Sequence, residues 1–121
     1  MVDRKRNKIY IICPVRRLTD EQSVEIEQYV KNLEDIGFEV HFPPRDVDQV
    51  DPIGFRICSE HAEAMRDCDR VDIFWDSNST GSHFDLGMAF ALNKPVMLLK
   101  LYAPDTEGKS FVKVIQKWEK Q

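Results

Sequence analysis

Three short apolar runs, each of strand length, most constrain what this chain can fold into. They cover residues 8–13, 71–75 and 95–101 and are rich in Ile, Val and Leu. They show little of the polar alternation that is typical of a half-exposed strand. Continuous apolar strands of this kind occur in parallel sheets that are covered on both faces. The runs therefore predict buried parallel strands, with the first run, which Pro14 ends, at the centre of the sheet.

Helical patterns separate these runs. A capping box from Thr19 to Gln22 and apolar residues at helical spacing predict a helix over 20–36, which Gly37 ends. Alternating residues over 38–42 predict a strand nearer the sheet edge, followed by a connection over about 43–51. A second helix is predicted to start at Asp51 and Pro52. Its buried side is predicted to carry Ile53, Ile57, Ala62, Met65 and Cys68.

The rest of the chain continues the alternation. A third helix is predicted over 82–93, and Ser110 is predicted to cap a last helix. The apolar residues of that last helix are Phe111, Val114, Ile115 and Trp118. Strands that alternate with helices through short connections imply right-handed crossovers and helices on both faces of the sheet. We therefore predict a single α/β domain over residues 1–121, a flavodoxin-like (Rossmann-like) three-layer sandwich with a parallel sheet of four to five strands in the order 2-1-3-4.

Composition narrows the class of protein. The chain has 121 residues, of which 42% are hydrophobic and 31% charged, and its formal charge is −4. An acidic balance argues against nucleic acid as the main partner, because binding its backbone needs clustered positive charge. No apolar run approaches the roughly 20 residues needed to cross a bilayer, so we expect a cytoplasmic protein without membrane association. Three cysteines without CxxC spacing predict reduced, mostly buried thiols and no metal site: Cys13, Cys58 and Cys68.

A polar loop directly follows the second apolar run and leads into the third helix. In an open parallel sheet, ligands bind where the chain reverses direction between neighbouring strands, which here are the first and third. The loop supplies the hydroxyls of Ser79 and Ser82, Gly81 allows close backbone approach, and Asp85 is predicted in the first helical turn. Ser82 as the helix N-cap with Asp85 three residues later explains the same segment without a ligand. The segment alone leaves both interpretations open.

Neighbouring segments offer partners for that carboxylate. Arg16 and Arg17, after the first strand, have the fork geometry that suits phosphate. Two solvated surface arginines without a ligand would give the same sequence pattern. Cleavage of glycosidic bonds usually needs a second acid or base beside a carboxylate. The candidates are Glu60, His61 and Glu63 on the second helix, and Asp76. His61 is the most versatile of them, because an imidazole titrates near neutral pH. Dinucleotide, P-loop and Gly-x-Ser-x-Gly motifs do not occur.

Four segments together resemble the nucleoside 2-deoxyribosyltransferase family, over about residues 8–101. They are 9–14, 68–73, 81–89 and 93–96. In that family a loop with a hydroxyl residue and glycine leads into a Glu-Leu-Gly-x-Ala helix start, whose Glu attacks the anomeric carbon. The matching residue here is Asp85. The resemblance implies cleavage or transfer of the N-glycosidic bond of a nucleoside, as a transferase or hydrolase, without metal or cofactor.

The same family includes 2′-deoxynucleoside 5′-monophosphate N-glycosidases. They bind phosphate with an arginine after the first strand and with serine and glycine before the nucleophile. Arg16, Ser79 and Gly81 match those positions, and Cys13 and Pro14 match the end of the first strand. A family serine that reaches the phosphate site across a homodimer corresponds to Ser110. The resemblance therefore implies a homodimer whose partner molecule is a small nucleoside or nucleotide.

Two departures from the family pattern support a second interpretation. Asp85 is one methylene shorter than the family glutamate, and a displacement of roughly 1 Å at a reacting group can reduce the rate about 100-fold. The family aspartate that protonates the leaving base aligns near His61, between Glu60 and Glu63. These changes are also what a nucleotide-binding or sensing module without catalytic activity would show. A flavin-binding module is a third hypothesis, in which Trp75 would stack on the flavin ring.

Overall fold

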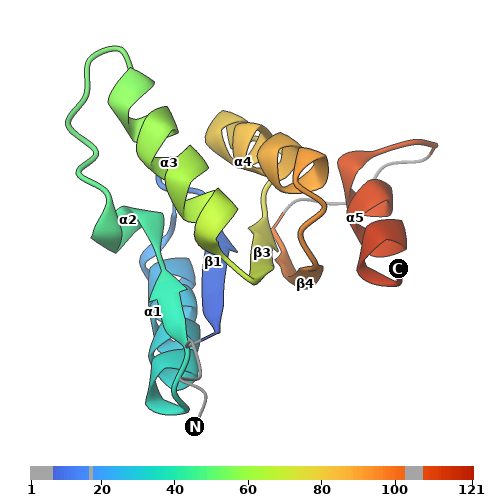
Figure 1. Cartoon of the computed structure of the whole chain (residues 1–121), viewed down its shortest axis with the longest axis horizontal. Coiled ribbons are helices and arrows are strands. Elements are labelled where there is room, and N and C mark those ends of the chain that lie inside the picture. Colours follow the sequence, from blue (N-terminus) through green and yellow to red (C-terminus); the bar gives the residue numbers. More distant parts are fainter. Residues whose placement is uncertain (1–6, 17, 103–107) are drawn as a thin grey trace, which may run out of the picture.

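The computed structural model describes residues 7–16, 18–102 and 108–121. Within these residues, strands and helices alternate along the chain (Figure 1). The strands are β1 (Lys8–Ile12), β2 (Glu39–His41), β3 (Arg70–Trp75) and β4 (Val96–Leu101). The helices are α1 (Asp20–Asp35), α2 (Pro43–Asp46), α3 (Phe55–Asp67), α4 (Thr80–Ala91) and α5 (Phe111–Glu119).

All neighbouring strands of the sheet are parallel, and their order is β2-β1-β3-β4. The predicted order 2-1-3-4 and the α/β class are thus confirmed. β1 lies between β2 and β3, with Tyr10 opposite His41 on one side and opposite Val71 on the other. The chain leaves β1 toward β2 but leaves β3 toward β4, so the carboxyl ends of β1 and β3 form the point where the direction of winding reverses.

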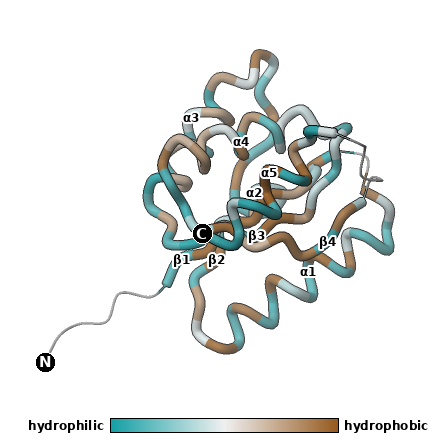
Figure 2. The backbone as a smooth tube through the Cα atoms, turned by 90° about the vertical axis from the view of Figure 1, so that its right-hand side faces the viewer, coloured by the Kyte–Doolittle hydropathy of each residue, from teal (hydrophilic) through white to brown (hydrophobic). Residues whose placement is uncertain are grey.

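The side chains of β1 alternate between two apolar cores. Ile9 and Ile11 pack with α1, through Ile26, Val30 and Leu33. Tyr10 and Ile12 pack on the other face with residues of α3, α4 and α5, which are Met65, Leu86, Ala89, Val112 and Ile115. Figure 2 shows α1 on one side of the strands and α3 and α4 on the other. The three-layer arrangement follows from this period of two in a strand that is buried on both faces.

The capping residues in the sequence correctly predicted where α1 and α5 begin. Thr19 caps α1, and Gln22 completes the capping box. Gly37 follows the helix with a φ of 103°, a conformation that glycine adopts without strain. Ser110 caps α5, as predicted, by accepting a hydrogen bond from the backbone N–H of Lys113. The apolar face of α5 is rotated from the prediction, because Val112 and Ile115 are buried while Phe111 and Val114 are exposed.

The start of α3 was predicted too early. Residues 43–46, expected to be part of a connection, form the short helix α2, which two prolines begin. α3 begins at Phe55, after Gly54 in the left-handed conformation. The Asp51 carboxylate accepts hydrogen bonds from the backbone N–H groups of Arg56 and Ile57, so it serves the start of the helix from outside it. Ile53 is 91% exposed and is not on a buried side.

Cys13, Cys58 and Cys68 are free thiols, and Cys13 and Cys68 are buried. Among the described residues, none of the helices combines the length and apolar character of a membrane span.

A buried ion pair holds the face of the sheet that α1 covers. Asp72, in the middle of β3, is fully buried. It accepts hydrogen bonds from Nε and Nη2 of Arg70 at 2.7 and 2.9 Å, and from the hydroxyl of Tyr29 on α1. A buried carboxylate is tolerated when its lone pairs are satisfied in this way. The polar residue inside an apolar strand is thus a structural link between β3 and α1.

Replacing Arg70 by alanine should destabilise the fold by about 3 kcal/mol, because it leaves the Asp72 carboxylate buried without its cation. The matched control is Lys31→Ala, which breaks the exposed pair with Asp35 on α1 and should change the free energy of unfolding by less than about 0.5 kcal/mol. Urea unfolding at pH 7 measures both. Equal effects of the two substitutions would show that the buried pair contributes no more than a surface pair.

Candidate active site

Asp85 lies in α4, deeper in the helix than predicted. α4 begins at Thr80, and Ser79 is its N-cap, because the Ser79 hydroxyl accepts a hydrogen bond from the Ser82 backbone N–H. The interpretation of Ser82 as the N-cap is therefore wrong, and the helix covers Thr80–Ala91 where 82–93 was predicted. Asp85 is the sixth residue of α4 and lies in its second turn. Because the effect of the helix dipole falls off within the first turn, other groups must stabilise this carboxylate.

Two side chains from other elements contact the Asp85 carboxylate, which is 4% exposed. The Tyr10 hydroxyl, from β1, donates a hydrogen bond to Oδ2 at 2.8 Å. Nδ1 of His61, from α3, lies 3.0 Å from Oδ1. The site thus joins the central strand to the two helices that cover it, and each carboxylate oxygen has a hydrogen-bonding partner.

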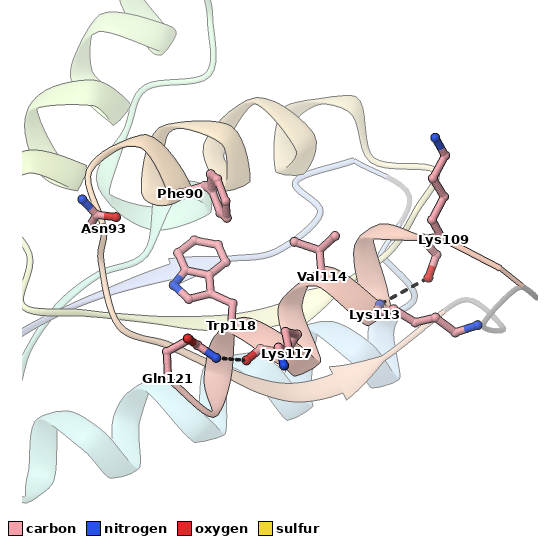
Figure 3. A pocket seen from close by; sticks show the side chains of 9 residues that line it. Phe90, Asn93, Lys109, Lys113, Val114, Lys117, Trp118 and Gln121 are labelled. Carbon is pink, nitrogen blue, oxygen red and sulfur yellow. Dashed lines mark hydrogen bonds between the residues drawn. The ribbon is translucent and has the colours of Figure 1, made fainter.

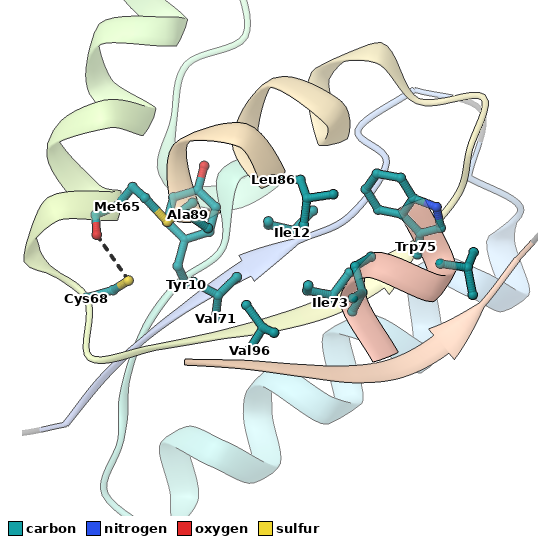
Figure 4. Close-up of a cluster of buried hydrophobic side chains, with 12 residues drawn as sticks. Tyr10, Ile12, Met65, Cys68, Val71, Ile73, Trp75, Leu86, Ala89 and Val96 are labelled. Atoms are coloured by element: carbon teal, nitrogen blue, oxygen red, sulfur yellow. Dashed lines mark hydrogen bonds between the residues drawn. The ribbon is translucent and has the colours of Figure 1, made fainter. Parts of the chain in front are cut away.

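Tyr10 was not among the predicted site residues. Burial, reinforced by the negative charge of Asp85, raises the pKa of its hydroxyl far above the usual range, so that the phenol stays protonated and donates. In Figure 4 its oxygen points past the apolar cluster toward the helix layer. The signal available in the sequence is a residue with a hydroxyl inside an otherwise aliphatic run, since a buried tyrosine hydroxyl usually has a hydrogen-bond partner.

His41 is a second residue that the sequence analysis missed. It follows Val40 on β2, and its ring lies 5.0 Å from the Tyr10 ring and 6.3 Å from the His61 ring, measured between centroids. Burial lowers the pKa of its imidazole. Nε2 of His41 and Nε2 of His61 are both buried without a hydrogen-bond partner among the described residues. Two imidazole nitrogens are therefore left unsatisfied on rings that lie beside the Tyr10 ring.

The structure brings one of the three acid or base candidates of α3 to Asp85. His61 lies four residues after Ile57 and four before Met65, which is fully buried, so the helical period places it on the buried face. Glu60 forms an ion pair with Arg56, and Glu63 is exposed. Asp76 accepts a hydrogen bond from the backbone N–H of Asn78 in the loop after β3.

The predicted substrate-binding residues lie around the carboxyl ends of β1 and β3. Cys13 and Pro14 are buried at the end of β1, where burial raises the pKa of the Cys13 thiol to about 12. Arg16 is exposed in the loop that follows. Arg17 lies outside the described residues. The Cys13 thiol, with its raised pKa, stays protonated at neutral pH and is therefore not a nucleophile.

Three further predicted substrate-binding residues lie at the start of α4, which follows the carboxyl end of β3. The hydroxyls of Ser79 and Ser82 lie 2.8 Å apart, and Ser82 is buried. Gly81 is exposed, and a Cβ atom added to it would meet open space. The backbone of the first turn of α4 is thus open to a ligand at Gly81.

Ser110 lies elsewhere. It lines a groove of about 730 Å³ between α4 and α5, whose lining does not include Tyr10, His61 or Asp85. In this groove Phe90 packs edge to face on Trp118, with ring centroids 5.2 Å apart (Figure 3). Within one copy of the chain, Ser110 is therefore part of a different surface from the Asp85 carboxylate.

The buried imidazole of His41 should make stability depend on pH. Because its pKa is lowered in the folded state, the unfolded chain binds more protons as the pH falls below about 6.5. His41 thus contributes stability above that pH, and the contribution is lost as the pH falls from 6.5 toward the folded pKa. The groups that face this ring are Tyr10, Arg45, Asp46, His61 and Asp85.

Between pH 7 and pH 5, the free energy of unfolding should fall less for the His41→Phe variant than for the wild-type protein. Urea unfolding at each pH measures it. The phenylalanine ring keeps the volume and removes the titrating group, while the carboxylates that also titrate are common to both proteins. Parallel stability curves for the two proteins would contradict the prediction.

Two solved structures of enzymes are similar to this chain in fold. No known protein-family model matches the sequence, and no curated protein matches it significantly. Among solved structures, the CMP N-glycosidase BcmB of Clostridium botulinum is similar, with 19% identity, a TM-score of 0.63, and 92% of this chain aligned with 81% of that one. A 2-deoxyribosyltransferase from Bacillus psychrosaccharolyticus is similar with 21% identity, a TM-score of 0.66, and 89% of this chain aligned with 90% of that one. The sequence resemblance to nucleoside 2-deoxyribosyltransferase-like proteins is thus confirmed in the fold, which this chain shares with both enzymes.

Proposed function

We propose that this protein cleaves the N-glycosidic bond of nucleosides or their 5′-monophosphates, so that the base is released and the sugar is transferred to water or to a second base. The observation that carries the proposal is the buried carboxylate of Asp85 with the His61 imidazole 3.0 Å away. A carboxylate stabilises the positive charge that develops at C1′ as the bond to the base breaks, and an imidazole can move a proton in the same step. The two enzymes of the same fold are described as acting on such bonds.

The arrangement around the carboxyl ends of β1 and β3 favours a phosphorylated substrate. The exposed Arg16 lies in the loop after β1, and the open backbone at Gly81 lies in the first turn of α4, which follows β3, the neighbour of β1 in the sheet. A guanidinium and the N–H groups at the start of a helix both bind phosphate oxygens well. We therefore propose Arg16, Ser79 and Gly81 as the phosphate-binding residues, and 5′-monophosphates as the preferred substrates.

Asp85→Ala should abolish base release, because the variant lacks the carboxylate of the site and leaves the His61 imidazole without its hydrogen-bonding partner. The assay is chromatography of free base from a panel of ribo- and deoxyribonucleosides and their 5′-monophosphates, with a second base supplied as acceptor. The control is Arg66→Ala, an exposed position on α3, which should keep wild-type turnover. Unchanged turnover in Asp85→Ala would refute the role of this carboxylate.

The same panel tests the alternative, a nucleotide-binding module without catalysis. Its supporting observation is that Tyr10 and His61 already occupy both oxygens of Asp85. If no substrate releases base while titration calorimetry detects binding of a 5′-monophosphate, the binding module replaces the enzyme as the conclusion.

We further propose that the protein is a homodimer and that α4 forms the contact. Apart from the buried Asp85, α4 carries no aspartate, glutamate, lysine or arginine. Phe84 and Phe90 are 50% and 59% exposed, and Gly87 lies exposed between them. A helix without a charged outer face is typically covered on all sides.

Gly87→Glu should convert the dimer to a monomer of 14.1 kDa, because it places a charge in the middle of that face. A Cβ at Gly87 meets open space, so the substitution leaves the single copy intact. Gly87→Ala is the matched control and should remain dimeric. Light scattering after size exclusion measures the mass, and a wild-type mass equal to that of one chain would refute the dimer.

A further inference from the structure

The hydrogen bonds of Asp85 limit what this carboxylate can do itself. Oδ2 accepts from the Tyr10 hydroxyl at 2.8 Å, and Oδ1 lies 3.0 Å from Nδ1 of His61. Each oxygen thus has a partner, and neither is presented to a substrate without first losing it. The shorter side chain of aspartate adds to this, because reacting atoms must approach within about 3–3.5 Å. The geometry is that of a group that positions a neighbour.

The neighbour is His61, and the contact with Asp85 determines its tautomer. An ionised carboxylate only accepts hydrogen bonds, so Nδ1 of His61 carries the proton in the neutral ring. The lone pair of that ring is then on Nε2. This nitrogen is buried and has no hydrogen-bond partner among the residues that the structure describes. A carboxylate that orients an imidazole, which in turn takes a proton on its far nitrogen, is the arrangement of a general base.

The other groups around the ring do not compete for this role. Tyr10 packs edge-on, with its centroid 6.1 Å from that of His61, and its raised pKa keeps it neutral. His41 lies 6.3 Å away, and its lowered pKa keeps it neutral at physiological pH. Among the residues that the structure describes, Asp85 is therefore the acidic group that the His61 ring contacts, and its negative charge stabilises the imidazolium that forms when Nε2 accepts a proton.

We propose that His61 is the general base of this site, that Asp85 and Tyr10 are positioning residues, and that the protein is a hydrolase and transfers no sugar. The inference rests on the proposed function. Nε2 of His61 takes a proton from a water molecule whose oxygen forms a bond to C1′. The C1′–N bond breaks, and its electron pair goes to the base, which takes a proton from bulk water. His61 then returns its proton to bulk water, so one nucleoside and one water yield free sugar and free base.

This route has a consequence that a nucleophilic carboxylate would not produce. If Asp85 attacked C1′, a glycosyl ester would persist until water or a second base displaced it, and the second base would become a new nucleoside. Direct attack by water leaves no such intermediate. Exchanged nucleoside, or a glycosyl adduct trapped on Asp85, would therefore report attack by the carboxylate.

The test uses the full chain and whichever substrate of the panel releases base, with a different free base in excess. We expect equimolar free sugar and released base, and no exchanged nucleoside. His61→Gln should lower kcat at least about 100-fold and remove the acidic limb of the pH profile of kcat. Asp85→Asn should lower kcat by a similar factor, because an amide also supports the opposite tautomer. Arg66→Ala should match the wild type in each measurement. An exchanged nucleoside, or a glycosyl adduct on Asp85 in the intact mass spectrum with a 2′-fluorinated substrate, would overturn the proposal.

A second measurement uses the wild-type protein alone and does not depend on enzymatic turnover. Nitrogen-15 spectra of the labelled wild-type protein at pH 7.5 should show His61 protonated on Nδ1 and bare on Nε2. A ring protonated on Nε2 and bare on Nδ1 would overturn the assignment whatever the activity. Base release accompanied by exchange would refute the hydrolase and leave the proposed function standing. Silence across the whole panel would refute the proposed function and the water-activation step together.

Discussion

The structure depends on a central strand that is buried on both faces. β1 has two neighbours in the sheet, and its side chains enter two separate cores in alternation. Ile9 and Ile11 fix α1 on one side, while Tyr10 and Ile12 fix the helices on the other. A shift of the pairing by one residue would exchange the two cores and remove the Tyr10 hydroxyl from Asp85, so the register of this strand sets both the packing and the site.

One buried carboxylate on each face shows how the fold accommodates charge. Asp72 lies on the α1 face and is satisfied by Arg70, a cation two residues earlier on its own strand, and by Tyr29. Asp85 lies on the other face, and its partners are a tyrosine and a histidine without a fixed positive charge. The first arrangement is closed, since three hydrogen bonds hold the carboxylate and two of them come from a permanent cation. The second can take up a proton at His61, and this difference separates a structural ion pair from a site with chemical capacity.

Much of the fold could be predicted because its signals are local. Capping at Thr19 and Ser110 involves residues three apart, and the apolar runs identify buried strands without knowledge of their neighbours. The start of α3 could not be placed so simply, because the Asp51 carboxylate reaches backbone groups five and six residues further along. The N-cap of α4 was misplaced for a related reason. Ser79 and Ser82 are equally good caps by residue type, and only the backbone conformation of the loop distinguishes them.

The sequence by itself determined the alternation of strands and longer helices, the strand order and the approximate position of the candidate site. These follow from the period of the apolar residues and from the handedness of crossovers, which are properties of short segments. Only the tertiary structure decided which groups meet. It brought Tyr10 and His61 to Asp85 across 75 and 24 residues and left Glu60 and Glu63 outside. The reason is that the rotation of α3 about its axis and the register of β1 are set by packing in a shared core, and no local pattern specifies a contact between segments so far apart in the chain.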